Sequence, residues 1–86
     1  MKAIVVYKEN DEDTRVVQEF LRDFEHQTNH NLDTLNPETP EGEQFCEAYG
    51  ILEYPTVIAI SDDGVMQNQW TNLPLPTISE VSYYVK

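Results

Sequence analysis

The stretch YGILEYPTVIAISDDG, residues 49–64, decides the fold of this chain. Gly50 is suited to end a helix in the left-handed conformation, because glycine has no Cβ to clash with the backbone. Beyond Pro55, residues Thr56 to Ile60 are almost all apolar, which is typical of a strand buried on both faces. Gly64 then accepts the positive φ of a turn. The stretch therefore predicts a helix end, a central strand and a hairpin.

The residues after this turn predict a partner strand and a closing helix. Val65 to Trp70 returns along the central strand as the second arm of the hairpin. Thr77 and Glu80 have the spacing of a capping box, in which each side chain satisfies a free amide at the start of a helix. The residues that follow on one face of this helix are apolar or aromatic: Ile78, Val81, Tyr84 and Val85.

The first half of the chain predicts a strand and an amphipathic helix. Lys2 to Tyr7 contains a short, uninterrupted and β-branched run that fits a central strand. A helix is expected from Thr14, with Asp11 or Asp13 as its N-cap. Its apolar positions recur at helical spacing: Val16, Val17, Phe20, Leu21 and Phe24.

Between these parts, the sequence predicts a short strand and a second helix. Leu32 and Leu35 fit a short strand of the kind that follows a crossover helix. Thr39 before Pro40 is typical of an N-cap with proline at the first helical position. The inward face of this helix is expected to carry Phe45, Ala48 and Tyr49.

The predicted order is β-α-β-α-β-β-α, with residues 1–86 forming a single α/β domain. A right-handed crossover followed by an antiparallel hairpin in the same sheet gives four strands in a mixed sheet, with helices on both faces.

The net charge of the chain limits the classes of molecule that it is expected to bind. Sixteen acidic against five basic residues give a formal charge of −11, which disfavours nucleic acid and anionic membrane surfaces. No apolar run approaches the ~18 residues that span a bilayer, and the start of the chain lacks a signal-peptide cleavage site. We expect a soluble, cytoplasmic monomer. Solubility explains the charge best, and recognition of a basic partner stays open.

The element order together with the 49–64 stretch resembles the thioredoxin-like superfamily, which includes thioredoxins and glutaredoxins. The resemblance covers the whole chain in architecture and is specific from about Phe45 to Gly64. It implies a thioredoxin-like fold in which Pro55 matches the cis-proline of the family. It also implies that Tyr54, just before it, presents its backbone to an extended substrate or to glutathione. A purely structural role of Pro55, setting the start of the strand, is an equal alternative.

The cysteine pair of such proteins is missing. Members of the superfamily place Cys-x-x-Cys or Cys-x-x-Ser between the first strand and the first helix, because a helix N-terminus stabilises a thiolate. Residues 8–15 of this chain read KENDEDTR instead, so Asp11, Glu12 and Asp13 occupy that position. Helix capping explains these carboxylates. TNLPLP, residues 71–76, also replaces the glycine usual near the cis-proline, so a reshaped groove puts glutathione binding in doubt.

Cys46 is the one cysteine, so neither an internal disulfide nor a Cys-x-x-Cys site exists. It lies beside Phe45 at the edge of an apolar face, and Glu43 and Glu47 disfavour its thiolate. A buried structural role is the preferred interpretation. No metal or cofactor is expected, because the acidic residues lack the calcium-loop spacing and the two histidines lack a third ligand.

We expect a redox-inactive thioredoxin-like domain that acts as a protein-binding or adaptor module, with no catalytic residue. The expected binding residues are Tyr54, Pro55, Asp11, Glu12, Asp13 and Thr14. Two alternatives stay open: a single-cysteine redox or glutathione-linked protein that uses an exposed Cys46, and an inert subunit whose acidic face docks a basic partner.

Overall fold

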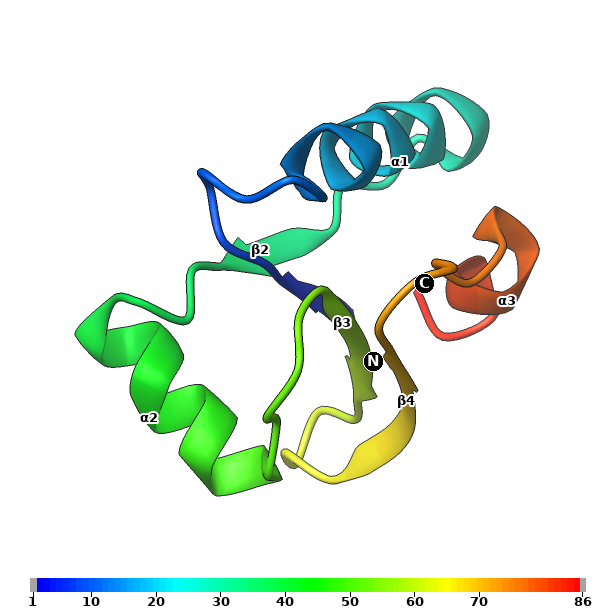
Figure 1. Cartoon of the computed structure of the whole chain (residues 1–86). Helices are drawn as coiled ribbons and strands as arrows, with labels where there is room; N and C mark the ends of the chain where they lie inside the picture. Colours follow the sequence, from blue (N-terminus) through cyan, green and yellow to red (C-terminus); the bar gives the residue numbers. More distant parts are fainter. Residues whose placement is uncertain (1, 86) are drawn as a thin grey trace.

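The computed structural model describes residues 2–85 and confirms the predicted order of elements (Figure 1). The elements are β1 (Lys2–Val6), α1 (Thr14–Thr28), β2 (Asp33–Leu35), α2 (Pro40–Tyr49), β3 (Thr56–Ile60), β4 (Met66–Thr71) and α3 (Ile78–Ser82). None of the helices within these residues is long and apolar enough to cross a lipid bilayer.

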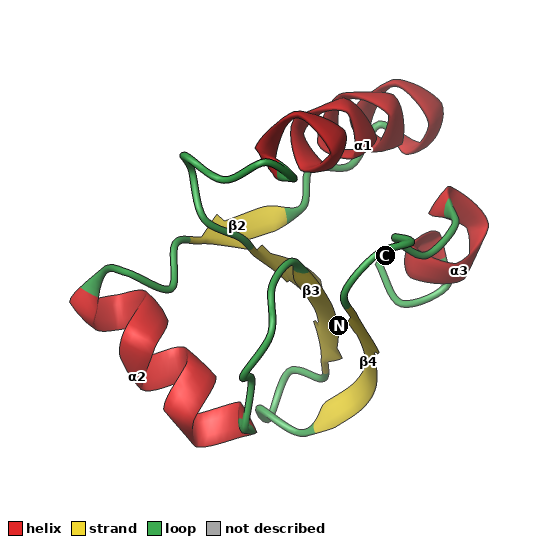
Figure 2. Ribbon diagram, viewed as in Figure 1, coloured by secondary structure: helices red, strands yellow, loops and turns green. Residues whose placement is uncertain are grey.

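The four strands form one mixed sheet in the order β2-β1-β3-β4, as predicted. β1 and β2 run parallel, with Val6 opposite Leu35. β1 and β3 run antiparallel, so Val6 lies opposite Thr56 at one end of the sheet and Lys2 lies opposite Ile60 at the other. Figure 2 shows α1 and α3 on one face of the sheet and α2 on the opposite face.

The alternation of side chains along β1 and β3 produces two cores. Successive residues of a strand point to opposite faces, and both faces of these strands are covered by helices. On the side of α1 and α3, the buried residues are Ala3, Val5, Val17, Phe24, Val57 and Val81. On the side of α2, they are Ile4, Val6, Cys46, Ile51, Ile58 and Ile60. The apolar runs of the sequence are therefore explained by burial on both faces.

The predicted ends of α2 and the start of α3 are confirmed. The Thr39 hydroxyl accepts a hydrogen bond from the Gly42 N–H at 3.1 Å, and Gly50 ends α2 with a φ of 69°. Both hydrogen bonds of the capping box between Thr77 and Glu80 are present. Gly42 has a second role, because a Cβ at this position would lie 1.9 Å from the carbonyl oxygen of Asn36.

Three details of the helices differ from what the sequence suggests. Asp13 occupies the N-cap position of α1, as predicted, but its backbone is helical and its side chain makes no capping hydrogen bond. Val16 is 44% exposed, whereas its neighbour Val17 in the same turn is fully buried, so the inward face of α1 begins at Val17. On α2, Phe45 and Tyr49 are half-buried and pack against the core as predicted, whereas Ala48 is exposed.

The hairpin partner strand begins one residue later than predicted, at Met66 rather than Val65. The register shifts at Ala59 and Ile60, where β3 and β4 form a β-bulge or a similar irregularity. Val65 lies in the turn and is 54% exposed. Gly64 in the same turn has a φ of 86°, as the sequence predicts.

Candidate functional site

The turn before β3 carries Tyr54 and Pro55, the first two residues of the predicted binding site. The peptide bond between them is cis, and Pro55 is buried. The Tyr54 ring is half-buried and packs against the core on the α2 side of the sheet. Burial raises the pKa of the Tyr54 hydroxyl, and the neighbouring Cys46 thiol raises it further. The hydroxyl therefore stays protonated at neutral pH.

Hydrogen bonds fix this turn on both sides of Tyr54. The Thr56 hydroxyl donates to the Glu53 carbonyl oxygen at 2.6 Å. The Asn72 N–H donates to the Pro55 carbonyl oxygen at 2.9 Å, and the Asn72 side-chain amide donates to the Glu53 carboxylate. None of these bonds uses the N–H or the C=O of Tyr54. The turn is thus held in place without its central backbone groups.

The start of α1 is connected to this turn through Lys8. The Thr14 hydroxyl accepts a hydrogen bond from the Asp11 N–H at 3.0 Å and donates one to the Lys8 carbonyl oxygen at 2.7 Å. The Lys8 ammonium then lies 5.5 Å from the centre of the Tyr54 ring, within the range of a cation–π contact. Thr14 is therefore part of the same assembly as Tyr54.

The three predicted carboxylates stay at the helix start. Asp11 and Glu12 are exposed, and the Asp11 carboxylate accepts a hydrogen bond from the Glu12 N–H at 2.7 Å. Asp13 is half-buried at the N-cap position. Within residues 2–85, the contacts recorded between the helix start and the turn run through Thr14 and Lys8, and not through these three carboxylates.

Sequence reasoning missed Lys8. It is the one basic residue between β1 and Thr14 in a strongly acidic loop, and it follows the strand end by two positions. A lone cation in such a loop is a usable signal, but its partner Tyr54 is distant in sequence. Only the tertiary fold brings the two together.

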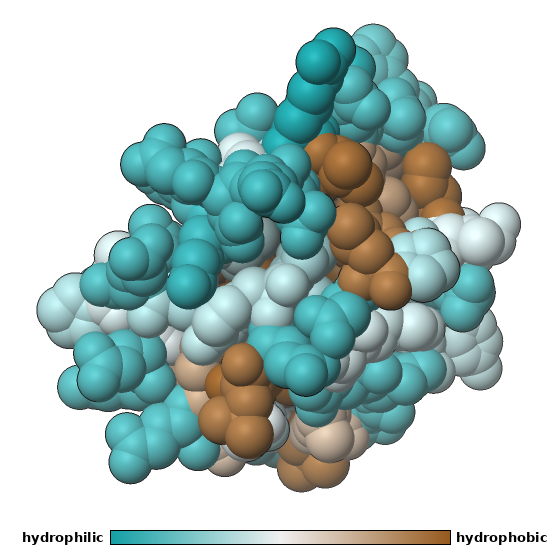
Figure 3. All heavy atoms as spheres, viewed as in Figure 1, coloured by the Kyte–Doolittle hydropathy of each residue, from teal (hydrophilic) through white to brown (hydrophobic). Residues whose placement is uncertain are grey.

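Exposed apolar side chains lie at the start of α1 and in the segments that follow β4 and α2. Val16 in the first turn of α1 is 44% exposed, Leu73 after β4 is 41% exposed, and Leu52 after α2 is 87% exposed. Figure 3 shows apolar surface between α1 and the segment that leads from β4 to α3. A second apolar patch lies where α2 ends. Such surface is typical of protein contacts when it is contiguous.

Cys46 lies in the core on the α2 side, 6% exposed, with its thiol close enough to Tyr54 to affect the tyrosine. Single-cysteine redox chemistry needs an accessible thiolate. This burial agrees with the interpretation of Cys46 as a small apolar core residue.

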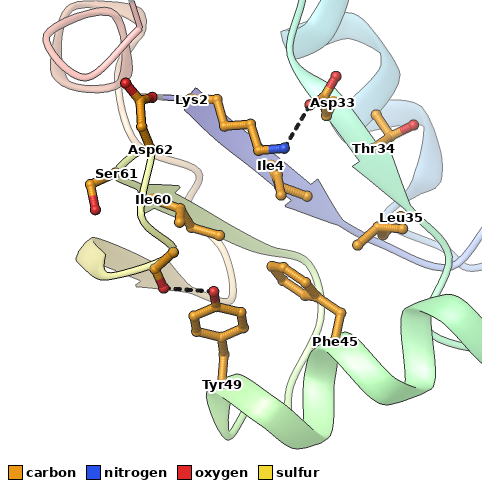
Figure 4. Close-up of a pocket in the computed structure, with 11 residues that line it drawn as sticks. Lys2, Ile4, Asp33, Thr34, Leu35, Phe45, Tyr49, Ile60, Ser61 and Asp62 are labelled. Atoms are coloured by element: carbon orange, nitrogen blue, oxygen red, sulfur yellow. Dashed lines mark hydrogen bonds and ion pairs between the residues drawn. The ribbon is translucent and has the colours of Figure 1, made fainter.

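A cavity of about 560 Å³ opens at the opposite end of the sheet (Figure 4). Ile4, Leu35, Phe45 and Ile60 give it an apolar lining, and Tyr49 closes one side. The Lys2 ammonium and the Asp33 carboxylate lie 3.9 Å apart at its rim. Sequence reasoning did not find this cavity, because its residues come from four elements and read as ordinary core positions.

The helix residues of the cavity are fixed by two contacts. The Tyr49 hydroxyl donates to the Gly64 carbonyl oxygen at 2.8 Å. The rings of Phe45 and Tyr49 have their centres 4.7 Å apart. The end of α2 is therefore attached to the turn between β3 and β4.

Among residues 2–85, no three side chains of His, Cys, Asp or Glu gather as a metal-binding group. His26 lies in the last turn of α1, where a basic side chain suits the helix end.

By sequence, the chain matches no protein-family model and no curated protein. By structure, it is similar to thioredoxin 1 from the thermophilic eubacterium Thermosipho africanus TCF52B, with a TM-score of 0.68. The match covers 99% of this chain and 90% of that thioredoxin, at 13% sequence identity. At this identity, the likeness concerns the fold alone. The order of elements, the mixed sheet and this match together establish that the chain has a thioredoxin-like fold.

Proposed function

We propose that this domain is a redox-inactive protein-binding module that captures an extended peptide segment at the turn of Tyr54 and Pro55. Residues 8–15, which precede and begin α1, hold carboxylates and no cysteine. Cys46 is buried in the core. Dithiol–disulfide exchange needs two accessible cysteine thiols. The chain has a single cysteine, and its thiol is buried.

One observation carries the proposal: among residues 2–85, hydrogen bonds hold the turn on both sides but leave out the N–H and C=O of Tyr54. Glu53, Pro55 and Thr56 are all engaged on either side. An extended peptide pairs with backbone groups of this kind through its own main chain, and side-chain contacts add specificity. No catalytic residue is required for such binding.

The apolar side chains nearby give the peptide something to contact besides the backbone. The Asn72 N–H donates to the Pro55 carbonyl oxygen, and Leu73 follows Asn72 directly, so Leu73 lies close to the turn. Val16 follows Thr14, which is connected to Tyr54 through Lys8. A peptide with apolar residues flanking its paired segment matches this arrangement. The acidic helix start favours a basic residue at one end of that peptide.

The same proposal includes action as a monomer in the cytoplasm. A protein with one buried cysteine has no need of an oxidising compartment. The formal charge of −11 favours a protein partner over nucleic acid.

The test is a selection of displayed random peptides on the folded protein, followed by affinity measurements with one synthesised peptide. We expect Pro55→Ala and Leu73→Asp each to weaken binding by at least about five-fold, which is typical of an interface residue that contributes substantially. Val65→Asp is the matched control, because Val65 is similarly exposed but lies in the turn at the other end of the sheet. Its affinity is expected to stay at the wild-type value.

Amide chemical shifts give an independent readout. The Tyr54 amide is expected to shift on peptide binding in the wild-type protein. If a folded Pro55→Ala variant binds the peptide as tightly as the wild-type protein does, the proposal is wrong.

A further inference from the structure

Three aromatic side chains gather where α3 lies against the edge strand β4. The ring centres of Trp70 and Tyr84 are 5.7 Å apart, and their planes are inclined by 69°. The centres of Tyr83 and Tyr84 are 5.0 Å apart, with planes inclined by 80°. Consecutive rings are therefore close to perpendicular, like adjoining walls. The same three residues line a groove of about 370 Å³ with Asn68, Ser79 and Glu80.

The side chains of this aromatic groove are held by contacts that do not need a ligand. Trp70 packs against the core on the side of α1 and α3. The Asn68 side-chain amide donates to the Tyr84 hydroxyl at 3.3 Å. The backbone N–H of Thr77 donates to the Glu80 carboxylate at 3.3 Å, and the Thr77 hydroxyl donates at 3.0 Å. The groove is thus preorganised, which reduces the entropy cost of binding.

Glu80 gives the groove its charge. It is the one charged residue among the six that line the groove. Hydrogen bonds from the Thr77 backbone and side chain lower the pKa of Glu80, and the Trp70 side chain adds a weaker effect in the same direction. The carboxylate is therefore ionised at neutral pH. An anionic ligand is disfavoured both here and by the charge of the whole chain.

The faces of aromatic rings attract cations, and a carboxylate beside them adds a direct charge contact. A bare ammonium is strongly hydrated and needs hydrogen-bond acceptors to replace its water. A methylated ammonium has apolar methyl groups around the charge, so aromatic walls suit it better. We propose that the aromatic groove of Trp70, Tyr83, Tyr84 and Glu80 binds a methylated ammonium group, as carried by trimethyllysine or by choline.

Trp70 is the only tryptophan of the chain, so its fluorescence reports directly on the groove. The probe is tetramethylammonium chloride, exchanged against sodium chloride at constant total salt. We expect a saturable change in Trp70 fluorescence. Choline is then compared with 3,3-dimethylbutan-1-ol, which has the same shape without the charge, and only choline is expected to produce the change. If Trp70 fluorescence stays unchanged when sodium is replaced by tetramethylammonium up to roughly 100 mM, the proposal is wrong. Equal binding of choline and the neutral alcohol would also overturn it.

Two variants locate the binding. Glu80→Gln removes the charge but keeps the capping box, because glutamine also serves at this position. We expect it to weaken tetramethylammonium binding by about two- to five-fold, the range of an exposed charge pair. Glu43→Gln is the matched control, because Glu43 also lies exposed in the first turn of a helix. This control is expected to bind as the wild-type protein does.

Tyr83→Ala removes one wall at little cost in stability, because Tyr83 is 67% exposed. The loss of an exposed cation–π contact is expected to weaken binding by about two- to five-fold. Unchanged affinity in both Glu80→Gln and Tyr83→Ala would contradict the proposed site. Finally, an acetylated trimethyllysine amide is compared with free choline. Tighter binding of the former assigns the group to a protein side chain, and tighter binding of the latter assigns it to a small molecule.

Discussion

The two ends of α2 differ in how closely they meet neighbouring segments. At the end of Val6 and Thr56, Gly42 lies so close to the preceding loop that a Cβ would be 1.9 Å from the Asn36 carbonyl oxygen. At the end of Lys2 and Ile60, the same helix encloses a cavity of about 560 Å³. One helix is therefore in close contact with the preceding loop at its start and lines a cavity at its end.

The difference separates two kinds of site. At the first end, hydrogen bonds from Thr56 and Asn72 hold the Tyr54 turn, as presentation of a backbone to a peptide requires. The hollow end has an apolar lining and an ion pair at its rim, features typical of sites for small molecules. The resemblance to thioredoxin-like proteins concerns the first end, whereas the cavity of about 560 Å³ lies at the second.

Gly42→Ala is expected to have the largest effect, and it tests the close contact at the start of α2. A methyl group at this position meets backbone atoms of Asn36, which have no rotamer by which to move away. We expect the free energy of unfolding to fall by about 2 kcal/mol or more, even though alanine favours helix by about 1 kcal/mol over glycine. Urea denaturation measures the change, and Glu43→Ala on the exposed side of the same turn is the control. A variant as stable as the wild-type protein would remove the close contact from the comparison.

Two substitutions on β1 test the difference in packing more finely. Val6 and Ile4 point to the same face of the sheet, but Val6 is fully buried at the packed end and Ile4 lines the cavity. Val6→Phe is expected to cost about 1–3 kcal/mol, because extra volume strains a filled core. Ile4→Phe is expected to cost clearly less, because its ring has space to enter. Equal losses in thermal or urea unfolding would mean that the cavity closes in solution.

The smallest expected effect concerns the pKa of Tyr54. Its folded-state pKa is raised above the ordinary value of 10.0, chiefly by burial and further by Cys46. A raised pKa means that the folded state holds its proton when the unfolded state releases it, so stability is lost as pH rises from about 10 through the folded pKa. Tyrosinate absorbance should show one late-titrating group that disappears in Tyr54→Phe. A wild-type curve without such a group would contradict the packing of Tyr54 against Cys46.

Much of the fold was predictable because its signals are local. The apolar runs of β1 and β3, the Thr39–Pro40 start of α2 and the capping box of Thr77 each depend on neighbouring residues, and each is confirmed. The burial of Cys46 was also predicted, but the exposure of Ala48 was not, because a helix with few apolar residues fixes its inward face only when it packs.

The candidate sites depend on distances in sequence that patterns do not reveal. Tyr54 and Pro55 were predicted through the resemblance, but the contact of Lys8 with Tyr54 arises from the packing of two loops. The cavity was not predictable, since a void reflects how side-chain volumes fit together and not which residues are apolar. Val16 belongs to the apolar stripe of α1 by its helical spacing, but the first buried residue of the helix is Val17, and the stripe alone does not show where burial begins.

The irregularity at Ala59 and Ile60 also affects how the protein behaves at high concentration. β2 and β4 are the outer strands of the sheet, and outer strands offer unpaired backbone groups to other copies of a chain. β2 is only three residues long and carries Asp33, whereas the longer β4 is distorted by the shift in register. Each outer strand thus carries a feature that hinders fibre-like stacking between molecules, and the repulsion from a charge of −11 acts in the same direction.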